Sequence, residues 1–403
     1  MKTMNVPTKK LLILSALIFL LSCKPKEARI IFTGDIIMHI PVKTCAASHN
    51  LIDRDKNVSL NNGGFDFLFE RIRPALSSSP VVIGNMEFPL SPPFTSQPKI
   101  FNCTPDVIAA MKKAGFTMVT IANNHILDQE QAGVIDSIAF LKKYGMEFIG
   151  VNTDEKTARS GIVKKTGDIA VGFIGYTGIT NYSIPSRPRG YYINWLYHED
   201  KILEDIREIK RRCDYLVMIF HTGTEYAPRP EEKDERAIKK YLEAGVDLAV
   251  GHHSHVVQQA EKIITPDGRT CYVFYSLGNF ISNQTESVID DPVNQSSNTQ
   301  DSIILNLFLH RSRSGAVSAR FEALPIHTYN ILNSGKKSRD IQTVSIPEEI
   351  DRLKKIRLES GELQRLAIDM EIEYLYSRIK VLKTALFSDQ KIDKIEFIAE
   401  KRE

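Results

Sequence analysis

The chain has little net charge, and this shortage excludes some classes of protein. Its 403 residues carry 52 Lys and Arg against 49 Asp and Glu, a formal net charge of +3. So small an excess, with both signs interspersed, gives no electrostatic basis for binding nucleic acid. The composition, 42% hydrophobic and 25% charged, is that of a folded soluble protein rather than a disordered or membrane-embedded one. The length suits one large domain or two ordinary ones, without internal repeats.

Cysteine is also scarce. The chain has five cysteines, and none of them has a C-x-x-C spacing, which excludes zinc-finger and redox motifs of that kind. Apart from Cys23, treated below, they are Cys45, Cys103, Cys213 and Cys271. In an exported protein these four could pair in three ways. The alternative is that they are buried as small apolar residues.

The apolar run near the N-terminus is too short to cross a bilayer. It covers eleven residues, Leu11–Leu21, after three lysines, whereas a membrane-spanning helix needs about 20. A positive stretch followed by a short apolar run is typical of a signal peptide. The residues Leu20-Leu21-Ser22-Cys23 resemble the bacterial lipobox, in which the cysteine becomes the lipidated first residue of the mature chain. We therefore predict a signal peptide over residues 1–22 and a lipid-anchored envelope protein facing outside the cytoplasm. The alternatives are an ordinary signal peptide and a fortuitous apolar start.

What the chain has instead is a repeated pattern of short apolar runs that end abruptly in polar residues. The runs are Arg29–Thr33, Pro80–Ile83, Phe116–Ala122, Tyr215–Phe220, Val246–Val250 and Cys271–Tyr275. Such unbroken runs are typical of buried strands in a parallel sheet. Amphipathic helices are predicted over Asp66–Ala75, Thr104–Ala114, Gln131–Tyr144, Lys201–Arg211 and Pro230–Ala244. The alternation of strands and helices indicates an α/β fold.

The segment 215–255 organises this pattern. It reads as a strand, a crossover helix and a second strand, so that both strands end at one edge of a parallel sheet. Open α/β sheets bind their ligands at that edge. Histidine follows each strand, as His221 after the first and as His252, His253 and His255 after the second. Four imidazoles at one edge indicate a metal site.

The remaining segments set the domain organisation. Two antiparallel hairpins are predicted, one over residues 163–176 and one over residues 302–326. The polar stretch 283–301 reads either as a disordered insertion or as a mobile loop beside the site. After Pro347 the pattern is helical and highly charged. We predict a signal peptide (1–22), a linker (23–28), one α/β domain (29–335) and a helical C-terminal extension (336–403).

The residues that follow the strands form a set with the chemistry of metal ligands. The set is Asp35, Glu87, Asn124, His125, His221, His253 and His255. Carboxylate or amide oxygens together with imidazoles suit two divalent transition metals, such as Mn, Fe or Zn. One bridging carboxylate can hold two ions about 3.5–4 Å apart, where they lower the pKa of a water and neutralise phosphoryl charge.

Six motifs in this order resemble those of the poly-γ-glutamate capsule synthesis family, the CapA-like proteins. They are GD at 34–35, GNMEFPLS at 84–91, ANNHILD at 122–128, HTGTEY at 221–226, GHHSHVVQ at 251–258 and SLGNF at 276–280. That family is similar in fold to the calcineurin-like metallophosphatases. The resemblance covers about residues 29–330 and implies a four-layer α/β/β/α sandwich, to which the C-terminal helical extension is added.

The resemblance also implies roles for single residues. Asp35 and His255 would bind the first metal, and Glu87 would bridge the two ions. The ligands of the second metal would be Asn124, His221 and His253. His125 corresponds to the general acid of the phosphatases, which protonates the leaving oxygen. Asp128 could orient the His125 ring or could cap a helix.

The chain departs from the phosphatase pattern at its first motif. The phosphatases open with Asp-x-His, whereas Asp35 is followed by two isoleucines. One histidine ligand is therefore absent unless His39 replaces it; otherwise we assign His39 to substrate binding. The bridging Asp is replaced by Glu87, one methylene longer. The sequence does not fix the register of the three neighbouring histidines; an H-x-H reading favours His253 and His255 as ligands and leaves His252 facing away.

Several polar residues outside the ligand set could contact a substrate. Glu225 could bind the second metal, act as a base or recognise an amine, and a surface salt bridge is the alternative. Three arginines in polar, proline-rich loops could hold an anionic substrate, or could simply be solvated. They are Arg187, Arg189 and Arg229.

Two functions remain open on the sequence. The first is an envelope lipoprotein with a dinuclear metal site that acts in the synthesis of a poly-γ-glutamate-like polymer. It would hydrolyse a phosphoester or related bond in that polymer, or act in its synthesis in another way. The second is a non-catalytic accessory subunit that binds an anionic chain beside membrane polymer-synthase subunits. Both readings place a lipid anchor in a membrane.

Overall fold

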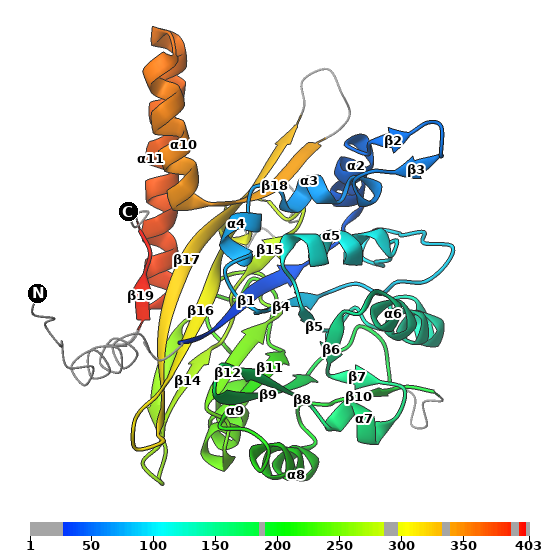
Figure 1. Cartoon of the computed structure of the whole chain (residues 1–403), viewed down its shortest axis with the longest axis vertical. Helices are drawn as coiled ribbons and strands as arrows, with labels where there is room; N and C mark the ends of the chain where they lie inside the picture. The colour runs from blue at the N-terminus through cyan, green and yellow to red at the C-terminus, as the bar shows by residue number, and fades with distance from the viewer. Residues whose placement is uncertain (1–26, 185–189, 286–296, 333–338, 388–394, 400–403) are drawn as a thin grey trace, which may run out of the picture.

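Two β-sheets pack face to face, and helices cover their outer faces (Figure 1). The computed structural model describes residues 27–184, 190–285, 297–332, 339–387 and 395–399. The predicted signal peptide, Cys23 and the two arginines at 187 and 189 lie outside these residues. Across the described ranges, the helices are too short or too polar to cross a bilayer.

The larger sheet contains strands whose carboxyl ends carry part of the predicted metal-ligand set. Its strand order is β18-β17-β16-β1-β4-β5-β6, with β15 beside β1 and β19 beside β17. The strands are β1 (Ala28–Ile36), β4 (Val81–Met86), β5 (Met118–Thr120), β6 (Glu147–Ile149), β15 (Asn279–Ile281), β16 (Asp301–Arg311), β17 (Val317–Leu332), β18 (Arg339–Ser345) and β19 (Ile395–Phe397). Because β1, β4, β5 and β6 are parallel, their carboxyl ends share one edge. The predicted hairpin of β16 and β17 is confirmed.

The smaller sheet contains the strands that end at the predicted histidine ligands. Its order is β13-β14-β12-β11-β9-β8. The strands are β8 (Ile162–Thr166), β9 (Ile169–Thr177), β11 (Tyr215–His221), β12 (Leu248–His252), β13 (Ala260–Ile264) and β14 (Thr270–Phe274). The predicted parallel pairing of β11 with β12 and the antiparallel hairpin of β8 and β9 are both confirmed. Two short ribbons lie apart, β2 (Ile52–Asp53) with β3 (Val58–Ser59), and β7 (Val151–Asn152) with β10 (Tyr192–Ile193).

Successive side chains of a strand point to opposite faces of its sheet, so that one set packs against the helices and the other packs between the two sheets. On β1, Ile31 packs with Val82 in the core beneath the helices of the larger sheet, whereas Ile30 and Phe32 pack with Val217 of β11 between the sheets. The larger sheet is covered by α2 (Ile40–Ser48), α3 (Asp66–Phe69), α4 (Arg73–Leu76), α5 (Asp106–Ala114) and α6 (Glu130–Tyr144), and the smaller by α8 (Glu199–Lys210) and α9 (Glu232–Ala244). Short helices α7 (Glu155–Arg159), η1 (Asn62–Gly64) and η2 (Ser297–Gln300) connect other elements. The predicted α/β/β/α sandwich is confirmed.

One predicted helix is wrong in its extent. The range Asp66–Ala75 divides into α3 and α4, with Pro74 in the first turn of α4. Proline has no N–H to donate to the carbonyl four residues earlier, so that it begins a new helix more readily than it continues one. The apolar spacing continues across the break, which is why the pattern read as a single helix.

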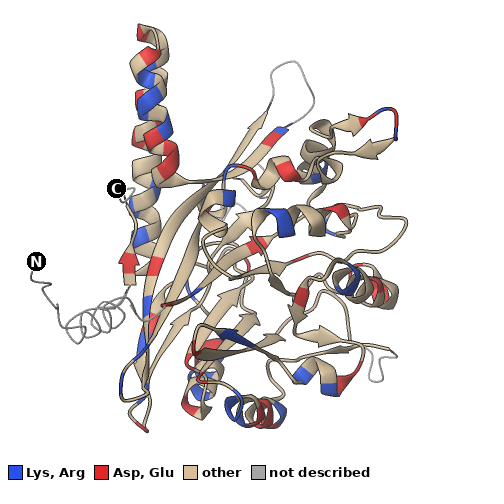
Figure 2. Ribbon diagram, viewed as in Figure 1, with Lys and Arg blue, Asp and Glu red and all other residues tan. Residues whose placement is uncertain are grey.

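The C-terminal segment is not wholly helical as expected. It begins with β18, which is the antiparallel partner of β17, and it includes β19, which pairs parallel with β17. Between these strands, α10 (Ile346–Glu359) and α11 (Glu362–Leu386) form a long helical pair that projects beyond the sheets (Figure 1). The base of the pair closes the core between the sheets through Ile346, Ile350 and Leu375. Acidic and basic residues alternate along its length (Figure 2).

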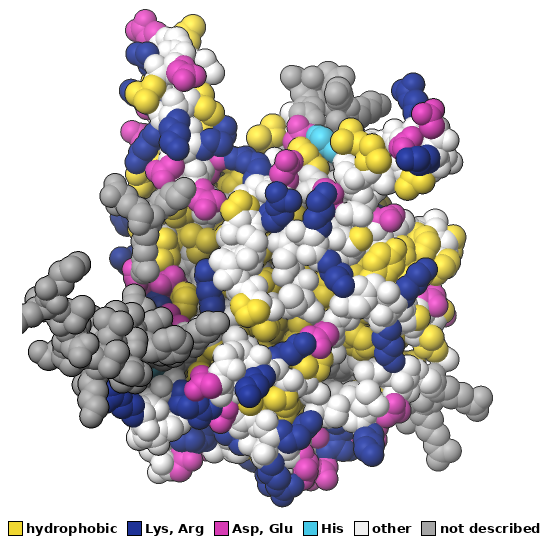
Figure 3. Space-filling model, in the orientation of Figure 1, with side chains coloured by type: hydrophobic (Ala, Val, Ile, Leu, Met, Phe, Trp, Pro, Cys, Tyr) yellow, Lys and Arg dark blue, Asp and Glu magenta, His cyan; other side chains and the backbone are white. Residues whose placement is uncertain are grey.

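The surface agrees with the weak net charge. On the face seen in Figure 3, basic and acidic side chains are interspersed, and neither sign forms a continuous field. The four cysteines within the described residues are free thiols, three of them fully buried. Burial is therefore the correct one of the two alternatives for Cys45, Cys103 and Cys271, and Cys213 is half-buried.

Candidate metal centre

The carboxyl ends of β1, β4, β11 and β12 meet between the two sheets. They carry Asp35, Glu87, His221 and His252, all of them buried. Asp35 lies beside Asn85 of β4 on one side and beside Asn279 of β15 on the other. The pairing of β1 with β4 shifts between Phe32 and Asp35, and such an irregularity re-aims the side chain that follows it. The strand ends thus gather polar groups in one place.

Two glycines and two strained histidines shape this meeting point. A Cβ atom on Gly34 would lie 1.9 Å from the carbonyl oxygen of Gly278, and one on Gly251 would lie 2.0 Å from that of Tyr275. Only glycine therefore permits this close approach of the backbone. His253 and His255 have φ values of 100° and 59°, a region that residues with a side chain rarely adopt. Strain of this kind is concentrated at functional sites.

Glu87 belongs to two groups of potential ligands. It forms one with His221 and His253, and another with Asp35 and His255, and within each group the ligand atoms lie within 4.8 Å of one another. Glu87 Oε1 is 3.9 Å from His221 Nε2 and 3.9 Å from His255 Nε2. One carboxylate therefore faces both groups, which is the geometry that a bridging ligand requires.

Two further predicted residues reach this centre. Asn124 Oδ1 lies 2.9 Å from His221 Nε2. Glu225 forms a third group of potential ligands with His253 and His255. The structure thus brings together all six residues predicted as metal ligands, and it adds Glu225 at the edge of the cluster.

The chemistry of the cluster fits divalent cations. Glu87 Oε1 and His253 Nδ1 are buried and have no hydrogen-bond partner among the described residues. Buried polar atoms are nearly always paired, so an unpaired carboxylate oxygen and an unpaired imidazole nitrogen in one cluster need an explanation. A cation that both atoms bind supplies one. Carboxylate, amide and imidazole donors suit Mn, Fe or Zn.

The two carboxylates have opposite pKa shifts. Burial raises the pKa of Glu87 well above its ordinary value, and the charges of Asp35, Glu225 and Asp128 add to this effect. Burial also acts to raise the pKa of Asp35, but hydrogen bonds from His252 and His255 outweigh it and hold this pKa well below the usual range. Ionised Glu87 thus requires a positive partner that the side chains alone do not supply.

The histidines divide in a similar way. Burial lowers the pKa of His221 well below its ordinary value and lowers that of His253 to about 4, in each case with help from a neighbouring histidine. Burial opposes protonation of His255 as well, but the hydrogen bond to Asp35, the charges of Asp35 and Glu225 and the hydrogen bond to Asn279 together outweigh burial and raise the pKa. Neutral His221 and His253 offer the lone pairs that a metal binds.

Three residues of the cluster were missed or misplaced by the sequence prediction. His252 does not face away, because its Nδ1 lies 2.8 Å from Asp35 Oδ1. Asn279 Oδ1 lies 3.0 Å from His255 Nδ1. Asn85 occupies the middle, where its amide donates to Asp35 Oδ1 at 2.9 Å and to Glu87 Oε2 at 3.1 Å. Asn85 lies two residues before Glu87, which directly follows β4, and the two-residue repeat of an extended chain was the signal that could have placed both side chains on one face.

A second pair of residues lies next to the metal cluster. His125 Nδ1 is 2.7 Å from Asp128 Oδ2, and the same carboxylate oxygen accepts the backbone N–H of Phe101 at 2.5 Å. The ring of Phe101 stacks on that of His125 at 4.1 Å between centroids. Asp128 therefore orients His125, and the helix-cap alternative is wrong because α6 begins after Gln129. With Nδ1 bound to Asp128, Nε2 is the nitrogen left for a ligand.

A cavity of about 1020 Å³ opens onto both groups. Its lining includes His39, His125, Glu225 and His255. His39 is not in any of the ligand groups found among the described residues, so it lies where a substrate contact was predicted rather than where a metal ligand would be. Arg229 is exposed and does not line this cavity. Lys99 is the cationic residue in this lining, and no sequence motif indicated it.

The fold and site define a class, a two-sheet α/β protein with overlapping carboxylate–imidazole groups at its strand ends. Residues 29–284 match the family model described as bacterial capsule synthesis protein PGA_cap. The chain belongs to this family, as its six motifs indicated. It is 28% identical over 238 residues to the capsule biosynthesis protein CapA of Bacillus anthracis, covering 56% of each chain. It is 24% identical over 299 residues to the PGA biosynthesis protein CapA of Bacillus subtilis, covering 72% of each.

A solved structure is also similar in part. The NAD nucleotidase of Haemophilus influenzae matches 93% of this chain and 65% of its own, with a TM-score of 0.44 and 12% identity. The chain therefore spans only part of the length of the proteins that it resembles, including little more than half of the Bacillus anthracis protein.

Proposed function

We propose that the protein is a metal-dependent hydrolase of the cell envelope that holds two divalent ions and acts on a phosphoester or related bond. The substrate would be part of a poly-γ-glutamate-like polymer or its precursor. The names of the two Bacillus relatives, both capsule or PGA biosynthesis proteins, support the second half of this proposal. The site residues support the first half.

The observation that carries the proposal is the position of Glu87. Its Oε1 is buried, unpaired and equally distant from His221 Nε2 and His255 Nε2. Asp35 and His255 would hold one ion, and Asn124, His221 and His253 the other, with Glu87 shared. Bound there, the ions would supply a Lewis acid that activates water and offsets phosphoryl charge.

The chain's own residues would supply the proton transfer and the positioning. The Asp128 carboxylate would accept the Nδ1–H of His125 and fix the ring, so that Nε2 would face the leaving oxygen and donate a proton to it. Phe101 fixes both partners, since its N–H binds Asp128 and its ring stacks on His125. His39, Lys99 and Glu225 line the cavity where the remainder of the substrate would lie.

Hydrolysis assays with added metal test this proposal. Phosphodiester and phosphomonoester substrates are to be compared for the wild type, for Glu87→Gln and for a His310→Ala control, whose histidine is exposed on β16. We expect turnover that a chelator abolishes, that Glu87→Gln loses and that His310→Ala retains. Turnover that survives both the chelator and Glu87→Gln would refute the role of the cluster.

The envelope location rests on the sequence pattern before residue 24. We propose that Cys23 carries the lipid and that the folded domain stands at a membrane surface outside the cytoplasm. Metabolic labelling with a fatty acid and fractionation of membranes should show label on the wild type and none on Cys23→Ser. A Cys23→Ser chain that remains labelled and membrane-bound would contradict this anchor.

A non-catalytic role is the second candidate, and Asn85 is the observation that favours it. Its amide nitrogen lies within 2.9–3.2 Å of Asp35, Glu87 and His221, where it offers hydrogen-bond donors to groups that would otherwise bind a cation. A site stabilised in this way could bind an anionic chain without cleaving it, beside membrane polymer-synthase subunits. Stable co-purification with such subunits, together with no turnover of any ester or amide, would favour this role.

A further inference from the structure

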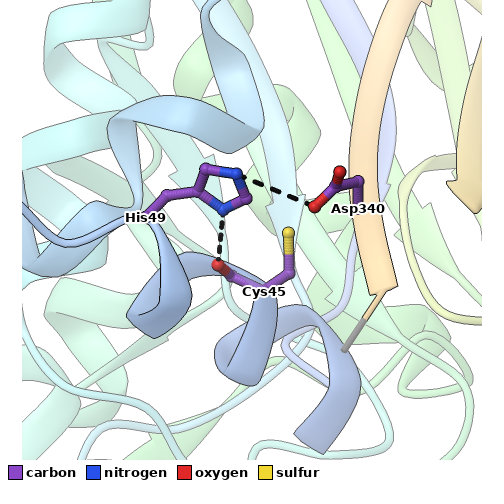
Figure 4. Close-up of side chains that lie close together, drawn as sticks. All are labelled: Cys45, His49 and Asp340. Carbon is purple, nitrogen blue, oxygen red and sulfur yellow. Dashed lines mark hydrogen bonds and ion pairs between the residues drawn. The ribbon is translucent and has the colours of Figure 1, made fainter. Parts of the chain in front are cut away.

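We propose a separate metal site, formed by Cys45, His49 and Asp340, that binds one zinc-type divalent ion and joins α2 to β18. The three side chains point toward a common space (Figure 4). Their ligand atoms lie within 4.8 Å of one another. Thiolate, imidazole and carboxylate are the three kinds of ligand that zinc takes from proteins. This site lies apart from the strand ends and shares no residue with the cluster there.

The spacing of two of the ligand atoms fits an ion better than it fits a hydrogen bond. His49 Nε2 and Asp340 Oδ1 are 3.7 Å apart. A charge-assisted hydrogen bond between such groups would be about 2.7–2.9 Å long. Around a tetrahedral zinc ion with bonds of about 2.0–2.3 Å, the ligand atoms lie roughly 3.3–3.8 Å from one another.

The surroundings of His49 select the nitrogen that would bind. Its Nδ1 lies 3.0 Å from the carbonyl oxygen of Cys45, which can only accept, so that Nδ1 carries the hydrogen. The Nε2 lone pair is then directed toward Asp340. Metal-binding histidines characteristically donate their other N–H to a carbonyl or carboxylate in this manner. Phe67 stacks on the ring at 3.5 Å between centroids and holds its orientation.

Cys45 would contribute its sulfur from the buried side of the site. Its Sγ is buried and accepts the backbone N–H of Ile341 at 3.2 Å. Burial nevertheless raises the pKa of this thiol to about 11, so that the sulfur would bind as a thiolate only with a cation beside it. The His49 and Asp340 side chains are 31% and 40% exposed, so that water can reach the fourth position of a tetrahedral site. Cys45 therefore lies on the buried side of the site, and His49 and Asp340 lie on the side that solvent reaches.

The site would connect distant parts of the chain. Cys45 and His49 lie on the last turn and the C-cap of α2, while Asp340 lies on β18, almost 300 positions later. The start of α2 follows directly after His39, which lines the large cavity. An ion bound here would fasten this helix to the sheet, in the manner of a structural zinc site.

Cobalt spectroscopy tests the site separately from the strand-end cluster, whose ligands include no sulfur. Titration of the full chain with Co²⁺ should give a sulfur-to-cobalt charge-transfer band in the near ultraviolet. We expect Cys45→Ser to lose the band, and Asp340→Asn to weaken the Co²⁺ affinity by at least about 10-fold, since even a changed neighbour of a ligand costs that much. The matched controls are Cys271→Ser, at another buried thiol, and Cys23→Ser.

Each outcome decides the question. The site is supported if Cys45→Ser abolishes the band while Asp35→Asn and both controls keep it. This result is independent of the hydrolysis assays. No band in the wild type, or a band that survives Cys45→Ser, would overturn it and leave His49 and Asp340 as an ordinary ion pair. Near-ultraviolet circular dichroism of Cys45→Ser checks that the variant is folded.

Discussion

Asp35 and His252 are 217 positions apart in the chain, yet Asp35 Oδ1 lies 2.8 Å from His252 Nδ1. The contact joins the end of β1 in the larger sheet to the end of β12 in the smaller one. It also favours the ionised form of Asp35 in a buried place. Groups in this cluster thus both offer ligand atoms to a cation and hold the sheets together, so that experiments on them need two readouts, metal content and stability.

The shared position of Glu87 predicts an unequal loss of metal among three variants. In a Cys45→Ser background, Glu87→Gln should lose both ions of the strand-end cluster, whereas His221→Gln and His255→Gln should each lose about one. Elemental analysis after dialysis measures the ion count. Equal losses in all three variants would contradict a bridging role. The stripped Glu87→Gln protein should melt at the same temperature or up to about 4 °C higher, because a neutral amide replaces a carboxyl whose pKa burial raises.

The contact of His125 with Asp128 predicts a dependence on the leaving group. His125→Ala should reduce turnover about 10²- to 10⁴-fold on esters with a poor alcohol leaving group. The loss should be much smaller with a nitrophenol leaving group, which departs without protonation. Asp128→Asn should show the same trend more weakly, and metal content should be unchanged in both. A uniform loss on all esters would assign His125 to binding rather than to proton donation.

Burial of neutral histidine predicts that the protein stripped of ions loses stability in mild acid. The pKa of His253 is lowered from 6.5 to about 4, so the unfolded chain binds more protons between these values and the folded state is progressively disfavoured as pH falls through them. His253 alone should cost roughly 3 kcal/mol of unfolding free energy across this window. Urea denaturation of chelator-treated protein at pH 4–7 measures the loss. His253→Gln should flatten the profile, and an unchanged slope would contradict the assignment.

The central amide of Asn85 predicts opposite effects of one substitution on stability and on metal binding. Asn85→Asp would replace a donor with a third buried carboxylate beside Asp35 and Glu87. The stripped protein should lose about 3–5 kcal/mol of stability, because a buried charge is left unpaired. Added Mn²⁺ or Zn²⁺ should restore the loss and bind more tightly than in the wild type. A destabilisation that metal does not relieve would favour the non-catalytic role.

The sequence predicted the larger features of the site because strand ends are easy to recognise. Asp35 and His221 each follow an apolar run, and parallel strands align their carboxyl ends at one edge. The same reasoning placed Glu87 and Asn124. Because the two sheets pack face to face, the ligands at the strand ends of one sheet meet those of the other.

The details failed where the backbone departs from regular geometry. The H-x-H spacing placed His253 and His255 together and left His252 facing away, but His252 is the last residue of β12 and follows Leu248 and Val250, which pack between the sheets. The side chain of His252 therefore points to Asp35, and positive φ at His253 and His255 marks the irregular backbone that brings their rings to the same cluster. Arg229 lies beyond another such turn, at Tyr226. Lys99 approaches the cavity only through tertiary packing, which no local pattern reports.

The boundary predicted at residue 335, beyond the end of the family resemblance, lies between β17 and β18. A truncation there would remove the antiparallel partner of β17 and would uncover the apolar cluster that Ile350 and Leu375 help to close. Contiguous apolar surface of that kind promotes aggregation in water. The folding unit therefore continues well beyond residue 284, where the family match ends.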